Sequence, residues 1–239
     1  MMTSIATMLR TAPGFAELDS DCLEHIATKG GLAEVGAGEV LFRERATPDA
    51  LFVLFDGRVS LTGISSDASS AVIDILEPAS SFVLANVLLG EPYQIGAQTV
   101  SDSLLVRIPA EPMREVVASR PTVAMAMMRA MATELGSMTR QVVDLKGRIA
   151  AQRLGTYLLS QVQEPTAAMA EFRLPVSKGL LASWLGCRAE NLSRAFMKLR
   201  AYGVETHGSR VLLRDVARLR EYAGTIDPML AIATRRLTA

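Results

Sequence analysis

Residues 39–109 hold six short segments rich in β-forming residues, and this repetition limits the fold more than any other feature of the chain. Turn residues separate the segments, and Asp56-Gly57 between two apolar runs is a strong hairpin signal. Many short strands at this spacing predict a sandwich or a jelly-roll barrel. The predicted strands are Glu39–Glu44, Ala50–Asp56, Arg58–Ile64, Ala71–Glu77, Gln94–Val100 and Ser103–Pro109.

A long amphipathic helix follows these strands, after a short helical segment that Pro121 ends. Its apolar or small residues recur at steps of four and three, the spacing of the a and d positions of a coiled coil. A helix packed on its own domain has similar spacing over three turns, but symmetric dimers are the commonest assembly and we favour a homodimer helix over residues 121–143. The predicted seam is Ala124, Met128, Met131, Leu135, Met138 and Val142.

A second helix is predicted to begin at Asp144, a residue suited to the N-cap position. Its apolar face would be Leu145, Ile149, Leu154 and Leu158. The chain then has three parts: a jelly-roll domain (1–120), a dimerisation helix (121–143) and a C-terminal domain (144–239).

Residues 171–215 have the pattern of two short helices and a hairpin. Ser177 can cap a helix over Lys178–Leu185, Gly186 takes the turn, and a second helix over Arg188–Tyr202 ends at Gly203. The hairpin turns at His207-Gly208, and a short strand, Phe172–Val176, precedes the helices. This order predicts a winged helix-turn-helix and an α+β protein, with Leu181, Leu185, Leu192, Ala195, Phe196 and Leu199 on the inner face.

The charge is unevenly distributed although the whole chain is neutral. Residues 1–120 hold eight Lys/Arg and sixteen Asp/Glu, whereas residues 173–239 hold twelve and five. A basic C-terminal domain favours a polyanion such as double-stranded DNA as its partner, although a solvated basic surface has the same composition.

The second helix of this domain presents Glu190, Ser193 and Arg194 on its outer side, where the early turns of a reading helix meet base edges. Arg can donate to guanine and Glu can accept from cytosine. Glu190 and Arg194 can also pair with each other at i,i+4, and an exposed ion pair without a DNA partner is the simpler alternative. The predicted phosphate contacts are Ser177, Lys178, Arg188, Asn191, Lys198 and Arg210.

Other classes of protein fit poorly. A jelly-roll enzyme with a metal site needs a His cluster, but the chain has two His, so we expect no enzyme and no such metal site. Its two Cys form no disulfide framework. No run of about 18 apolar residues and no secretory signal is present, so we expect a soluble, cytoplasmic protein without a membrane partner.

The chain resembles the Crp–Fnr family of bacterial transcription regulators over about residues 10–225. Three stretches carry this resemblance: FVLFDGRVSL, DLKGRIA and LASWLGCRAENLSRAFMKLRAYG. It implies an effector-responsive homodimer that binds DNA and RNA polymerase. Glu190, Ser193 and Arg194 match the E-x-x-S-R pattern of the Fnr-like branch, and Ala189 stands where the Crp branch has Arg. This implies palindromic sites with TTGAT-like half-sites. A sensor or adaptor that acts through protein partners is the alternative.

The effector stays open. The family's cyclic-nucleotide sensors place Gly-Glu and Arg-Ser where this chain has Leu84-Ala85 and Ile95-Gly96, so a cyclic phosphate would lack a cation and cyclic AMP is not expected. An iron–sulfur cluster needs four thiolates, and only Cys22 and Cys187 exist. The chain looks most similar to the nitric-oxide-responsive DNR/NNR branch, which implies haem, with His25 as candidate ligand or as a plain surface His. The candidate effector pocket is Leu84, Ala85, Ile95, Gly96, Met128 and Met131. Target genes, the sign of regulation and the DNA binding of the effector-free form are also left open.

Overall fold

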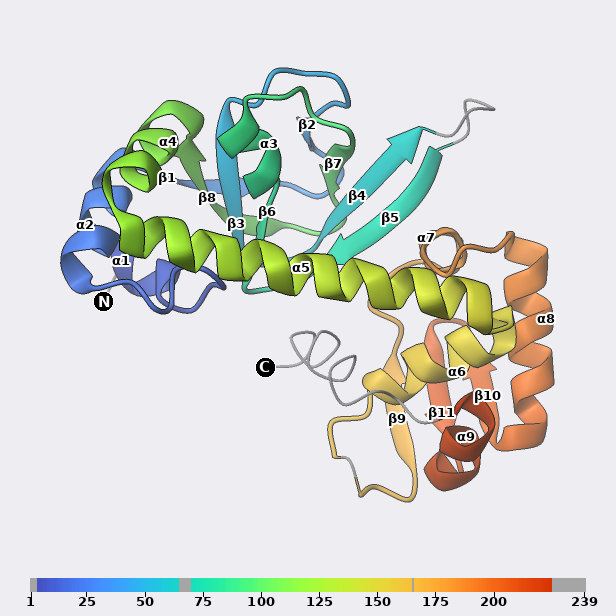
Figure 1. The fold of residues 1–239 in the computed structure, drawn as a ribbon. Helices are drawn as coiled ribbons and strands as arrows, with labels where there is room; N and C mark the ends of the chain where they lie inside the picture. The colour runs from blue at the N-terminus through green and yellow to red at the C-terminus, as the bar shows by residue number, and fades with distance from the viewer. Residues whose placement is uncertain (1–3, 65–69, 165, 225–239) are drawn as a thin grey trace. The chain divides into compact units, whose positions relative to one another are not determined.

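The computed structural model describes residues 4–64, 70–164 and 166–224 (Figure 1). The chain divides into two compact units, Met1–Gly136 and Ser137–Ala239. The last part of the predicted C-terminal domain, residues 225–239, lies outside the described residues.

The first unit is built on two four-stranded antiparallel sheets. One has the order β1 (Gly31–Val35), β8 (Ser103–Pro109), β3 (Ala50–Asp56) and β6 (Ser80–Phe82). The other has the order β2 (Val40–Phe42), β7 (Gly96–Thr99), β4 (Val59–Ile64) and β5 (Ser70–Leu76). This is the strand order of an eight-stranded jelly roll, and the predicted fold class is confirmed.

All six predicted strands are present, with ends shifted by up to two residues, and two further strands of this unit were not predicted. β1 is largely exposed, so its sequence lacks a buried apolar stripe. β6 has three residues, two of them serines, and pairs with β3 so that Phe82 lies opposite Phe52. Short or exposed strands leave little periodic signal in a sequence.

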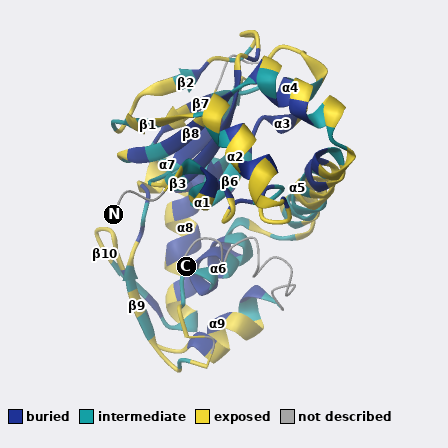
Figure 2. Ribbon diagram, turned by 90° about the vertical axis from the view of Figure 1, so that its left-hand side faces the viewer, coloured by how far each residue is buried: buried dark blue, intermediate teal, exposed yellow. Residues whose placement is uncertain are grey.

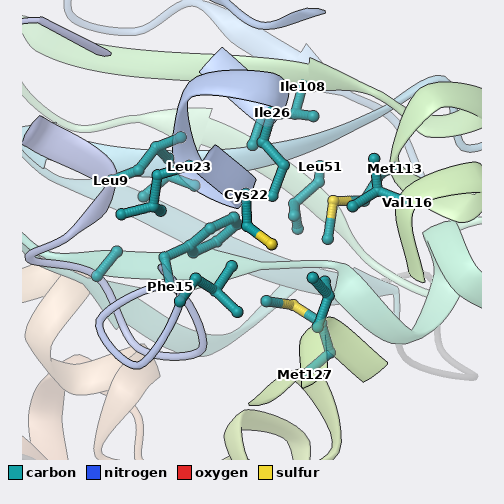
Figure 3. Close-up of a cluster of buried hydrophobic side chains, with 14 of the residues drawn as sticks. Leu9, Phe15, Cys22, Leu23, Ile26, Leu51, Ile108, Met113, Val116 and Met127 are labelled. Carbon is teal, nitrogen blue, oxygen red and sulfur yellow. The ribbon is translucent and has the colours of Figure 1, made fainter. Parts of the chain in front are cut away.

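Strand β3 is buried on both faces, and Figure 2 shows it with β8 in the interior. Phe52 and Leu54 point between the two sheets, where an aromatic cluster of Phe42, Phe52, Phe82 and Tyr93 fills the space. Leu51 and Val53 point the other way, into a core closed by helices (Figure 3). Because side chains alternate between the two faces of a strand, the residues of β3 contribute to two separate cores. The helices of this unit are α1 (Ile5–Leu9), α2 (Ser20–Lys29), α3 (Leu84–Leu89), α4 (Ala110–Ser119) and the first part of α5 (Pro121–Gly147).

Helix α5 packs on the first unit through Val123, Ala126 and Met127, which are buried. The predicted seam lies along other positions of the helix. In the single chain its members Met128, Leu135, Met138 and Val142 are exposed, while Ala124 and Met131 are half-buried.

The predicted helix start at Asp144 is wrong. Helix α5 continues through Asp144 to Gly147, and α6 (Ala150–Ser160) begins after Ile149. The Asp144 carboxylate lies 3.3 Å from the Arg148 guanidinium at i,i+4, a pairing that stabilises a continuing helix rather than capping a new one.

The second unit packs three helices and a three-stranded antiparallel sheet around α6. After α6 come β9 (Ala170–Arg173), α7 (Lys178–Trp184), α8 (Ala189–Leu199), a 3-10 turn (Arg200–Tyr202), β10 (Val204–His207), β11 (Arg210–Leu213) and α9 (Val216–Ala223). Leu154 and Leu158 are buried as predicted. Leu145 and Ile149 are about half exposed, so they do not belong to the buried face of α6. None of the helices in the described part of the chain is long and apolar enough to cross a membrane.

Candidate nucleic-acid interface

Helices α7 and α8 form the predicted helix-turn-helix. The Ser177 hydroxyl accepts a hydrogen bond from the Leu180 amide at 3.2 Å and so caps α7. Gly186 takes the turn with φ +64°, a left-handed conformation that favours glycine. All the predicted inner-face residues are buried: Leu181, Leu185, Leu192, Ala195, Phe196 and Leu199.

The predicted helix bounds need small corrections. Helix α7 ends at Trp184, one residue early, and Arg188 is the N-cap residue of α8 rather than part of it. The last turn, Arg200–Tyr202, tightens to a 3-10 helix before Gly203, where φ is +80°. The strand predicted at Phe172–Val176 lies slightly earlier, as β9.

Glu190, Ser193 and Arg194 are all exposed on α8. The Ser193 hydroxyl donates to the Ala189 carbonyl oxygen at 3.1 Å, which leaves its lone pairs available to a ligand. The predicted ion pair between Glu190 and Arg194 is not formed, and within the described ranges neither side chain has a salt-bridge partner. Because a carboxylate and a guanidinium at i,i+4 are both long and hydrated, an exposed pair gains little from closing.

Basic side chains surround this face. The Lys178 ammonium lies 5.3 Å from the centre of the Phe196 ring, and the Lys198 ammonium lies 5.6 Å from the centre of the Tyr222 ring. Arg188 and Asn191, also predicted to contact phosphates, are exposed beside them. These contacts hold Lys178 against α8 and Lys198 against α9, while the charged ends of both lysines stay accessible.

The β10–β11 hairpin is the predicted wing, but its arginines are already paired. Arg210 donates to the Glu171 carboxylate on β9, and Arg214 donates bidentately to the Glu205 carboxylate on β10. These hydrogen bonds hold the pKa of Glu171 and of Glu205 below the ordinary value of a glutamate. A phosphate contact by Arg210 would therefore have to replace an internal ion pair.

A residue that the sequence did not single out ties the turn to the preceding helix. Arg153 on α6 donates through Nε to the Leu185 carbonyl at 2.9 Å and through Nη1 to the carbonyls of Arg148 and Leu145. It thereby connects the end of α5, the start of α6 and the turn before α8. An arginine beside the apolar positions of an amphipathic helix is the only sequence signal for this role, and it is weak.

Known protein families and relatives with the same architecture match this sequence. Residues 32–120 match the family model described as the cyclic nucleotide-binding domain, and residues 152–222 match the Crp-like helix-turn-helix domain. The transcriptional activator protein FnrA of Stutzerimonas stutzeri is 26% identical, covering 86% of this chain and 85% of the relative. This chain belongs to the Crp/Fnr family.

One further relative and one solved structure are also similar to this chain. The nitrogen fixation regulation protein FixK of Azorhizobium caulinodans is 26% identical over 82% of this chain and 80% of its own. The structure of FixK2 from Bradyrhizobium japonicum superposes with a TM-score of 0.70, at 20% identity, over 83% of this chain and 99% of that chain. At this identity the latter shows the fold alone.

The candidate effector residues in the first unit of this Crp/Fnr-family chain do not converge on one space. Leu84 is buried in the helix-covered core, and Met131 packs against the same core. Ile95 instead packs against the aromatic cluster between the sheets, close to Gly96 at the start of β7. Ala85 and Met128 are exposed. The side chains thus fill two separate cores or face solvent.

The residues near His25 do not fit a haem group. His25 is exposed on α2, whereas the Cys22 side chain is buried one turn earlier and accepts a hydrogen bond from Arg120 Nη1 at 2.8 Å. The described residues include no group of three or more His, Cys, Asp or Glu side chains that could hold a metal ion. The space between the sheets is occupied by aromatic rings, Phe42 and Tyr93 stacking at 4.0 Å between centroids.

Proposed function

We propose that this Crp/Fnr-type regulator is a homodimer that reads palindromic DNA with TTGAT-like half-sites, the Fnr-type site, through α8. Support comes from one relationship above all: Glu190, Ser193 and Arg194 share an exposed face of α8 while its opposite face is buried in the domain. This presents hydrogen-bonding side chains to a partner on a rigid support.

The chemistry of the three side chains suits base edges in the major groove. The Arg194 guanidinium can donate two hydrogen bonds to guanine O6 and N7, and the Glu190 carboxylate can accept from a cytosine amino group. Since neither side chain forms an ion pair with a described residue, no internal bond has to break before they bind. Glu190 repels phosphates, so its contribution is to specificity rather than to affinity.

Affinity would come from the basic and polar groups that border α8. Ser177, Lys178, Arg188, Asn191 and Lys198 are exposed and would contact phosphates. Arg210 would join them only by leaving Glu171. The contacts with phosphates fix the orientation of the reader and carry no sequence information.

Dimerisation would occur along the seam of α5. Met128, Leu135, Met138 and Val142 are exposed at coiled-coil spacing, and they are distinct from the residues that pack on the first unit. A C2 dimer presents two readers to two half-sites, which accounts for a palindromic target.

The effector is a separate proposal. The resemblance to the nitric-oxide-responsive DNR/NNR branch implies haem, although His25 is exposed and the nearby Cys22 is buried and bonded to Arg120. A haem titration followed by the Soret band tests it directly: an unchanged Soret band removes haem from consideration. RNA polymerase is the protein partner that the resemblance implies.

The test of the proposed function is a gel shift with a TTGAT-N4-ATCAA duplex. We expect the wild type to bind this duplex more tightly than a scrambled one, and Arg194→Ala to lose about 1–3 kcal/mol of discrimination at the guanine. Equally weak binding by wild type and variant would contradict the proposal and favour an adaptor that acts through protein partners.

A further inference from the structure

Met197 is an exposed apolar residue on the reading helix. The residue is 59% exposed, whereas the other large apolar residues of α8, Leu192, Phe196 and Leu199, are buried. A helix in water gains nothing from presenting a methionine among polar side chains. Single exposed apolar residues are common, however, so exposure alone does not indicate a role for Met197. Its position on the helix is the stronger observation.

The position of Met197 places it beside the proposed base-reading residues. It follows Arg194 by three residues and Ser193 by four, so the three side chains share one helix face. Helical side chains lean toward the N-terminus, which brings the thioether over the turn that carries Ser193 and Arg194. Glu190 and Met197 are separated by about 10 Å along the axis, within the roughly 12 Å width of the major groove.

A shallow hollow of about 220 Å³ lies next to Met197 on this face. Ser193 and Met197 line it from α8, Lys178 lines it from α7, and Arg200 and Thr206 line it from the following segments. Two cations therefore border an apolar surface, an arrangement complementary to a ligand whose outer part is anionic and whose inner part includes apolar groups. A DNA duplex has both, because phosphates follow its surface and thymine methyl groups line its major groove.

We infer that Met197 contacts the 5-methyl group of a thymine next to the base read by Arg194 and is thus a further specificity-determining residue. This inference rests on the proposed function, since it needs α8 to enter the major groove. The unbranched thioether is polarisable and adapts its shape to a methyl group. Met197 adds preference for thymine without a hydrogen bond.

The experiment begins with selection of bound sequences from a random duplex library by the wild-type protein. Each thymine of the selected site is then replaced by uracil, which removes only the 5-methyl group. We expect one thymine position in each half-site at which uracil weakens wild-type binding about fourfold. This factor corresponds to the free energy of burying one methyl group. Met197→Ala should bind the thymine and uracil duplexes equally at that position.

Two further variants make the outcome specific. Met197→Leu keeps the apolar volume and should retain the preference for thymine. Met169→Ala removes an exposed methionine that precedes β9 and should behave as the wild type. The inference is wrong if Met197→Ala keeps the full thymine preference, or if the wild type shows none at any position. A wild type that selects no sequence would instead refute the proposed function itself.

Discussion

Leu145 at the end of α5 packs so closely on the Gly186 turn that a Cβ on Gly186 would lie 2.8 Å from Leu145 Cδ2. The turn that sets the direction of α8 is therefore shaped by the last part of α5. Arg153 reinforces the same junction through its hydrogen bonds to the Leu185, Arg148 and Leu145 carbonyls. A shift of this end of α5 would be transmitted to α8 through these contacts.

Gly186→Ala should destabilise the protein more than Gly208→Ala. Both glycines have positive φ, +64° and +63°, so each substitution costs about 1–2 kcal/mol of backbone strain. Only at Gly186 does the new methyl group also meet a neighbour, since nothing lies within 4 Å of a Cβ at Gly208. Urea denaturation measures both, and Leu145→Ala in the Gly186→Ala background should remove the excess. Equal losses for the two glycines would show that the Leu145 contact is unimportant.

Arg153→Met should weaken both the fold of the second unit and DNA binding. The substitution removes hydrogen bonds from a charged guanidinium to three carbonyl groups. Each such bond is worth about 1.5–3 kcal/mol when it is well formed. Because water can replace some of these bonds, the loss of stability should be smaller than their sum. The unfolding midpoint and the affinity for the TTGAT duplex are the measurements. Arg173→Met, at an exposed position on β9, serves as control and should change neither. An Arg153→Met protein that matches this control would contradict the proposed role.

Removing the wing carboxylates should make DNA binding more dependent on salt. Glu171→Gln and Glu205→Gln free Arg210 and Arg214 to contact phosphates, and each new contact should steepen the slope of log K against log salt by about 0.9. The pairing lowers the pKa of both glutamates, so their ion pairs persist through the neutral range and are lost only as pH falls through the lowered pKa. The effect of the substitutions should therefore be constant near neutral pH. An unchanged slope would mean that the wing stays away from DNA.

A charge on the α5 seam should dissociate the proposed dimer, whereas the same charge next to it should not. Val142 and Val143 are both exposed, but only Val142 lies on the seam. Val142→Glu should raise the dimer dissociation constant at least about tenfold, equivalent to 1.4 kcal/mol, because it buries an unpaired carboxylate. Val143→Glu should leave it unchanged. Sedimentation equilibrium gives both constants, and identical values would remove the seam from the interface.

Cyclic AMP should not stabilise the protein. Its phosphate would find no cation at the positions of the family's binding motif, which here are Leu84, Ala85, Ile95 and Gly96. A ligand that does bind the folded protein raises the free energy of unfolding by about 2.7 kcal/mol at a hundred times its Kd. A thermal unfolding series with increasing cyclic AMP measures this, and the Tm should stay constant. A concentration-dependent rise in Tm would contradict the assignment of this region as unsuited to the cyclic phosphate.

The parts of the fold that depend on local pattern could be predicted from the sequence. β3 and β8 have their predicted bounds because apolar residues and turn signals define both ends, and Ser177 caps α7 as expected. Asp144 was misread because the same carboxylate can cap a new helix or pair with Arg148 just past the end of the preceding one, and only the neighbouring backbone decides between these states. The role of Arg153 depends on three carbonyls that are brought together by folding, so an arginine beside the apolar positions of α6 is only a weak sequence signal of it.

The charged surface of the second unit was predictable in composition but not in pairing. A count of basic residues treats Arg210 and Lys178 alike, yet Arg210 is neutralised by Glu171, 39 positions earlier in the chain, while Lys178 rests on Phe196 with its charge accessible. The strand pairing of β9 with β11 creates the first contact, and it is a long-range consequence of the fold.

The most direct test of the central claim is a double-mutant cycle between Arg194 and the guanine of the half-site. Affinities are measured for wild type and Arg194→Ala, each with the guanine duplex and with a 7-deazaguanine duplex that lacks the N7 acceptor. If Arg194 reads this base, the losses will not add, and the coupling energy will be about 1–3 kcal/mol. Additive losses, with a coupling energy near zero, would show that α8 does not read the guanine through Arg194.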